Sequence, residues 1–78
     1  MKKEELYTIA ANVLKKNEVN ISKSQYSVPL KQLHIDSLKT MQIIIDVEEK
    51  VGKQLDSEVL MNIKTIDEMV DYFSKITA

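Results

Sequence analysis

The chain has 78 residues, with 11 basic and 12 acidic side chains, no cysteine, one glycine and one proline. A length at the low end of the domain range leaves room for one small core, so we expect a single domain over residues 1–78. The net charge of −1 at pH 7 argues against the basic surface of a nucleic-acid-binding protein. With no disulfide available and few turn formers, packed helices are the favoured way to stabilise so small a core.

We expect neither a membrane span nor a secretory signal in this sequence. Its longest apolar runs, such as Ile43 to Ile45, have three residues, far below the ~20 that cross a bilayer. Glu4 and Glu5 stand where a secretory signal would place its apolar region. We therefore expect a cytosolic protein, and a monomer.

The first predicted helix covers residues 3–17. Its apolar residues recur at the spacing of one helix face: Leu6, Ile9, Ala10, Val13 and Leu14. From residue 17 to residue 36 this periodicity is lost, and serines, asparagines and Pro29 are interleaved with apolar side chains. This connection is unusually long for a compact domain, and its apolar residues predict that it packs against the core.

A second helix is predicted from Asp36 or Ser37, both good N-cap residues, to about Val51. Gly52 then supplies a residue that readily adopts the left-handed conformation at which helices end.

A short helix is predicted over residues 57–62, and Thr65 with Glu68 forms the capping-box pattern of a last helix. The predicted buried stripe of that helix consists of Ile66, Met69, Val70, Phe73 and Ile76. The fold class is therefore all-α: a four-helix bundle with a long first loop and a short third helix.

Three roles are open to Ser37, at the start of the second helix: cap, nucleophile or attachment point. His34, Asp36 and Ser37 are the residue types of a hydrolase triad. Three side chains within four consecutive residues do not converge as a triad requires, and there is no GxSxG motif, so we expect no enzyme and no metal site. A serine at a helix start usually caps it. The same position would also tolerate an attached phosphodiester, because free amides and the helix dipole favour anions there.

The segment Leu30-Lys31-Gln32-Leu33-His34-Ile35-Asp36-Ser37-Leu38 resembles the LxxLGxDSL signature of acyl carrier proteins. The resemblance extends over nearly the whole chain and implies the same four-helix fold. It implies that Ser37 carries a covalent 4′-phosphopantetheine arm. For Asp36 it leaves two roles open, capping alone or also helping to position a metal ion during loading.

The resemblance also implies a function. A phosphopantetheinyl transferase would modify Ser37, and acyl-loading or aminoacyl-loading enzymes and downstream synthases would then use the thioester-bearing arm. Three features depart from the family pattern, which has glycine at 34 and acidic residues at 39 and 42: His34, Lys39 and Gln42. Together with the weak net charge they leave fatty acid synthesis and specialised polyketide or nonribosomal peptide pathways all open. The alternative function is an unmodified helical module for protein–protein interaction.

The second helix carries more apolar residues than one face needs. At about 100° per residue, Ile43, Ile44, Val47 and Val51 share a core-facing arc. Leu38, Met41 and Ile45 form a second arc, with Gln42, Asp46 and Glu49 beyond it. Either the bundle wraps the helix on two sides, or the second arc is a partner surface, which we assign to Leu38, Lys39, Met41, Gln42, Ile45, Glu48 and Glu49.

Overall fold

The computed structural model describes all 78 residues and contains only helices and their connections. The α-helices are α1 (Lys3–Lys16), α2 (Ser37–Val51), α3 (Ser57–Asn62) and α4 (Ile66–Ile76). The connection between α1 and α2 contains two short 3-10 turns, η1 (Lys23–Gln25) and η2 (Leu30–Leu33). The all-α four-helix fold with a short third helix is thus confirmed, with the bounds of α1, α2 and α3 and the start of α4 within one residue of those expected.

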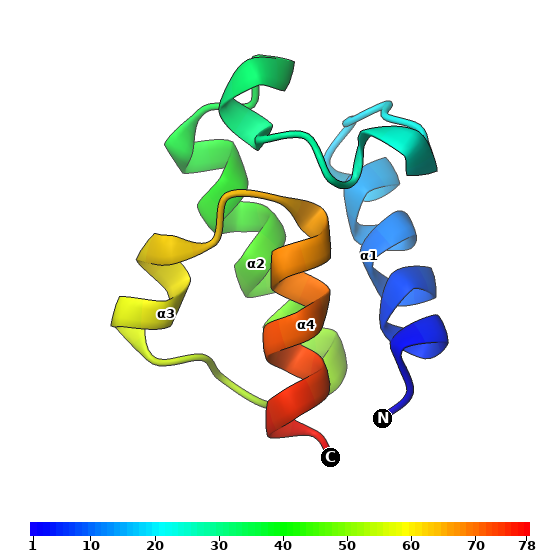
Figure 1. The fold of residues 1–78 in the computed structure, drawn as a ribbon, viewed down its shortest axis with the longest axis vertical. Coiled ribbons are helices and arrows are strands. Elements are labelled where there is room, and N and C mark those ends of the chain that lie inside the picture. Colours follow the sequence, from blue (N-terminus) through cyan, green and yellow to red (C-terminus); the bar gives the residue numbers. More distant parts are fainter.

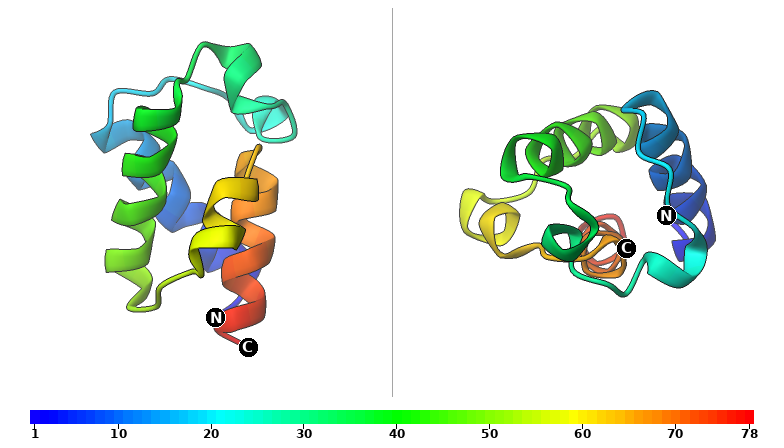
Figure 2. Two further views of the ribbon diagram at one scale, coloured as in Figure 1. Left: turned by 90° about the vertical axis from the view of Figure 1, so that its left-hand side faces the viewer. Right: turned by 90° about the horizontal axis from the view of Figure 1, so that it is seen from above.

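The helices surround one core, in which α1 packs against both α2 and α4 (Figure 1). The connection between α1 and α2 crosses one end of the bundle, while both chain termini lie at the other end (Figure 2). There the amino group of Met1 donates a hydrogen bond of 2.7 Å to the carbonyl of Thr77. The start of α2 therefore lies at the end that the long connection covers.

The long connection packs down, as its apolar residues predict. Tyr26, Leu30 and Ile35 are buried in the common core. Two backbone bonds tie it to the start of α4 and the segment before it: the amide of Leu30 donates to the carbonyl of Lys64 (2.8 Å), and the carbonyl of Tyr26 accepts from the amide of Asp67 in α4 (3.0 Å). The two 3-10 turns were not predicted, because three or four residues are too few to show a period.

The expected bounds of α2 and the expected start of α4 are confirmed, whereas two other expectations for α4 are not. Gly52 ends α2 with a φ of +78°, and the Thr65 hydroxyl caps α4 by accepting from the amide of Glu68 at 3.0 Å. The second half of the expected capping box differs, because the Glu68 carboxylate accepts from the amide of Lys64. The expectation that Ile76 is buried is wrong: it lies in the last turn of α4, beyond the core, and is 40% exposed.

The end of α1 places Glu18 in the left-handed region, with a φ of +60°. The amide of Glu18 donates to Lys15 (3.0 Å) and that of Val19 donates to Leu14 (2.8 Å), which is the Schellman motif. Glycine is the usual residue at such a position, because a Cβ atom raises the energy of this conformation.

Glu18→Gly is therefore expected to raise the free energy of unfolding by about 0.5 to 1 kcal/mol. The melting temperature of a domain this small should rise by roughly 4 °C or more per kcal/mol, which calorimetry would measure. Glu49→Gly is the matched control inside α2, where the same change should destabilise by about 1 kcal/mol. A Glu18→Gly protein that melts at a lower temperature than the wild type would contradict the left-handed conformation of Glu18 at the end of α1.

Candidate functional site

Asp36 caps helix α2. Its backbone is extended and its carboxylate Oδ1 accepts the amide of Lys39 at 2.8 Å, while its carbonyl accepts the amide of Thr40 at 2.9 Å. Of the two N-cap residues left open by the sequence, the structure uses Asp36. Ser37 is consequently the first residue inside the helix.

The hydroxyl of Ser37 has no part in capping. The side chain is exposed and takes part in no side-chain hydrogen bond of the structure. The amides of Ser37 and Leu38, which a helix of this length cannot satisfy internally, also remain free. An exposed hydroxyl thus stands beside two free donors and the positive end of the helix dipole, an arrangement that accommodates a phosphodiester.

The triad residue types do not assemble. His34 ends η2 as an exposed residue with a φ of +61°, and no hydrogen bond joins it to Asp36 or Ser37. Its left-handed backbone explains why glycine suits this position. Histidine adopts the conformation more readily than most side chains, so the local turn is kept.

Asp46 is the one buried charged residue, 8% exposed, although the helical arc places it on the outer side of α2. Its carboxylate accepts one hydrogen bond from Asn17 Nδ2 and one from Gln42 Nε2, both 2.9 Å long. The bond from Asn17, at the end of α1, together with that from Gln42, lowers the pKa of Asp46 despite the opposing effect of burial. The sequence placed Asp46 beyond the second apolar arc of α2 and did not predict its burial, which accompanies its bond to Asn17 at the end of α1.

Asp46→Asn should lower the free energy of unfolding by about 1 to 3 kcal/mol at neutral pH, because the side-chain amides of Asn17 and Gln42 lose their charged acceptor at a buried position. The pKa of Asp46 is depressed in the folded state, so its contribution is present above the unfolded pKa of about 3.9 and is lost as the pH falls through the folded pKa. Urea unfolding of the wild type and of Asp46→Asn should therefore show a difference in the free energy of unfolding that narrows as the pH falls below about 4.

The control is Asp71→Asn, which removes the exposed 2.7 Å ion pair between Asp71 and Lys3 and should change stability by less than about 1 kcal/mol. If Asp46→Asn changes the free energy of unfolding no more than this control does, the bonds that Asp46 accepts from Asn17 and Gln42 do not stabilise the contact between α1 and α2.

The expected partner surface separates into two groups. Leu38, Met41 and Ile45 are 82%, 41% and 39% exposed, so the bundle does not wrap this side of α2. Three of the polar members instead bond within the chain: Lys39 Nζ donates to the Asn17 carbonyl (3.2 Å), Gln42 to Asp46, and Glu48 accepts the amide of Leu55 (2.7 Å). Glu49 is exposed.

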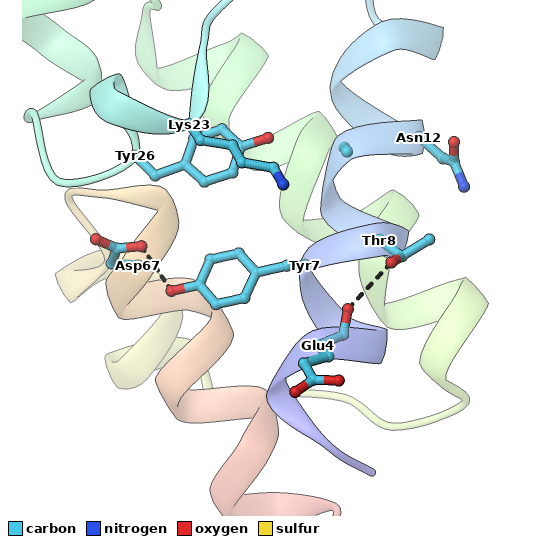
Figure 3. A pocket seen from close by; sticks show the side chains of 8 residues that line it. Glu4, Tyr7, Thr8, Asn12, Lys23, Tyr26 and Asp67 are labelled. Carbon is cyan, nitrogen blue, oxygen red and sulfur yellow. Dashed lines mark hydrogen bonds between the residues drawn. The ribbon is translucent and has the colours of Figure 1, made fainter.

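Ser37 lines neither of two hollows in the surface. The larger, about 640 Å³, lies between α1, η1 and the start of α4 (Figure 3). There the rings of Tyr7 and Tyr26 stack in parallel with centroids 5.9 Å apart, and the Tyr7 hydroxyl donates to Asp67 at 2.6 Å. A smaller cleft of about 300 Å³ includes Asp36 and Lys39 in its wall but not Ser37. Sequence periodicity could not find either hollow, since both join segments far apart in the chain.

Comparison with known proteins identifies the family. A family model described as a phosphopantetheine attachment site matches residues 4–73. The chain belongs to the acyl carrier protein family. It is 31% identical over 81 aligned residues to an acyl carrier protein of Acidothermus cellulolyticus, covering 99% of this chain and 94% of the relative.

Further relatives agree with this membership. An acyl carrier protein homolog of Ureaplasma parvum serovar 3 is 31% identical over 82% of this chain and 83% of its own length. One of Mycoplasma genitalium is 35% identical over 67% of this chain and 62% of its own length. No solved structure is significantly similar to the chain. Acyl carrier proteins are carriers rather than enzymes, and they bear a covalent 4′-phosphopantetheine group and interact with modifying and synthase enzymes. The longest helix has 15 residues, and no membrane-spanning segment is found.

Proposed function

We propose that Ser37 of this acyl carrier protein bears the 4′-phosphopantetheine group and that the chain carries acyl intermediates as thioesters on it. The observation that carries the proposal is that Asp36, and not Ser37, caps α2. Asp36 provides the cap, which leaves the Ser37 hydroxyl exposed and without a hydrogen-bond partner.

Loading on this proposal is a phosphoryl transfer in which the Ser37 oxygen bonds to the phosphorus that bears pantetheine in coenzyme A. The pyrophosphate bond breaks, adenosine 3′,5′-bisphosphate leaves, and the hydroxyl proton passes to a base of the transferase. The free amides of Ser37 and Leu38 stabilise the negative charge of the resulting phosphodiester. Asp36 holds the first turn of α2 by its bond to Lys39.

The thioester linkage of the cargo follows from the arm, because the arm supplies the thiol that the chain itself lacks. The names of the relatives support an acyl rather than an aminoacyl group. The pathway proposed is acyl-chain synthesis of the fatty acid or polyketide type, served by a transferase, loading enzymes and synthases.

The lack of cysteine makes the test direct. After incubation with coenzyme A and a broad-specificity phosphopantetheinyl transferase, thiol titration should rise from none to one thiol per chain. A loading enzyme with its acyl donor should then remove that thiol, and hydroxylamine should restore it. A chain that acquires no thiol is the unmodified helical interaction module, and the proposal fails.

A further inference from the structure

The hollow between α1, η1 and the start of α4 has no part in the proposed attachment or in the carriage of thioesters. We call it the tyrosine hollow, because the rings of Tyr7 and Tyr26 form part of its wall (Figure 3). Its volume of about 640 Å³ lies within the range of roughly 300 to 1,000 Å³ that is usual for small-molecule sites. It is therefore large enough to hold a ligand of its own.

The tyrosine wall is held in place by three separate segments of the chain. The Tyr7 hydroxyl, on α1, donates to the Asp67 carboxylate in the first turn of α4 at 2.6 Å. The amide of Asp67 donates in turn to the carbonyl of Tyr26, in the long connection, at 3.0 Å. The two rings are parallel to within 1°, with centroids 5.9 Å apart. Fixed, flat ring surfaces of this kind favour a flat ligand that can stack on them.

The hydroxyl of Tyr26 is a free polar group in this wall. Tyr26 is only 7% exposed, and its hydroxyl makes no hydrogen bond within the chain. Since no fully buried polar side-chain atom of the structure lacks a partner, the small exposed surface of Tyr26 includes this hydroxyl. It lies at the hollow (Figure 3), where its oxygen is free to accept a hydrogen bond from a ligand.

The charged side chains of the tyrosine hollow favour a cation. Two carboxylates line it, those of Glu4 and Asp67, against one ammonium group, that of Lys23. Glu4 and Lys23 are exposed and form no ion pair, so the flexible Lys23 side chain can turn towards water. Lys3 and Asp71, one residue and one turn away from the two acids, pair with each other at 2.7 Å. The faces of tyrosine rings attract cations as well.

We infer that the tyrosine hollow is a binding site for a small flat molecule that bears a cationic amidinium, guanidinium or ammonium group. The flat part lies against the tyrosine wall, and the cation donates hydrogen bonds to the Glu4 carboxylate or to the Tyr26 hydroxyl oxygen. Such a ligand contacts α1, the long connection and α4 together, so its binding stabilises the folded chain. The inference does not depend on attachment at Ser37.

The test uses three probes of nearly the same flat shape: benzamidinium, benzamide and benzoate, which are positive, neutral and negative at neutral pH. Each is titrated into the unmodified chain while backbone amide NMR signals are recorded. Benzamidinium should bind with a Kd on the order of 1 mM, as expected for so small a ligand, and should shift the amides of Thr8, Asn12 and Lys23 most. Benzamide should bind at least about fivefold more weakly, and benzoate should show no saturable shifts. At about ten times its Kd, benzamidinium should raise the melting temperature by roughly 5 to 10 °C.

Matched variants separate the hollow from the general charge of the surface. Glu4→Gln should weaken benzamidinium binding by about threefold or more, whereas Glu5→Gln should leave it nearly unchanged. Both changes remove one negative charge from the first turn of α1, but only Glu4 lines the hollow. Lys23→Gln should strengthen binding by about twofold. Ala11→Phe, at an exposed position of the wall, should fill the hollow and abolish binding while the chain stays folded.

Ser37→Ala should bind benzamidinium as the wild type does, which keeps this test separate from the one for attachment. Any of four results would overturn the inference. These are benzoate or benzamide binding as tightly as benzamidinium, equal effects of Glu4→Gln and Glu5→Gln, unchanged binding by Ala11→Phe, and the absence of saturable shifts at the hollow with benzamidinium.

Discussion

Ile43→Ala is expected to lower the free energy of unfolding by roughly 2 to 5 kcal/mol. Ile43 is fully buried in the core between α1, α2 and α4, so its removal leaves a cavity that a packed interior fills only in part. A domain of this size has a total stability of only a few kcal/mol. Urea unfolding should therefore show a large loss, with a measurable unfolded fraction of the variant even without denaturant.

Ile45→Ala provides the comparison on the same helix. Ile45 is 39% exposed and lies on the second apolar arc of α2, with Leu38 and Met41, so the same truncation should cost less than about 1 kcal/mol. The two variants separate stability from recognition: one should unfold the protein, the other should only slow its loading. Equal destabilisation by both would mean that α2 is buried on two sides.

Tyr7→Phe is expected to lower the free energy of unfolding by about 1.5 to 3 kcal/mol at neutral pH, because the Tyr7 hydroxyl donates a hydrogen bond to a carboxylate. This 2.6 Å bond to Asp67 joins α1 to the first turn of α4 across 60 positions of sequence. The Tyr7 ring also stacks on Tyr26, a contact that phenylalanine retains. Tyr72→Phe is the control, since the Tyr72 hydroxyl makes no hydrogen bond.

The destabilisation by Tyr7→Phe should become smaller as the pH rises above about 10. Burial, followed by the bond to Asp67, raises the pKa of Tyr7 to about 12. A raised pKa means that the contribution is complete below the unfolded pKa of about 10 and is lost between about pH 10 and 12. The stability gap between wild type and Tyr7→Phe should narrow over this range, and tyrosinate absorbance should show one of the three tyrosines ionising last. A gap that is constant with pH would mean that the hydroxyl is exposed to water.

The elements of this fold were predictable where the signal is local. The apolar period of α1, the glycine at 52 and the Thr65 cap each act within one or two turns of helix, and every helix bound that was predicted lies within one residue of the observed one. The burial of Asp46 was not predictable in the same way. It depends on Asn17, 29 positions earlier, and periodicity within α2 carries no information about which residue of α1 meets it.

The candidate site, too, could be predicted from the sequence only where the signal is local. Asp36 and Ser37 are both good caps by residue type, and only the fold determines that Asp36 accepts the amide of Lys39 and leaves the Ser37 hydroxyl free. The arc of Met41 and Ile45 on α2 left burial on a second side and exposure both open, and only the fold shows that they are exposed. The bonds of Lys39 and Glu48 could not be predicted, because their partners lie in other segments of the chain.

The most direct test of the account is the intact mass of three proteins after incubation with coenzyme A and a broad-specificity phosphopantetheinyl transferase. The chain contains a second Asp-Ser pair at a helix start, Asp56 and Ser57 at the beginning of α3, which supplies a matched control. Wild type and Ser57→Ala should each gain the mass of one phosphopantetheine, and Ser37→Ala should gain none while melting like the wild type. A mass gain in Ser37→Ala, or none in the wild type, would contradict the assignment of Ser37.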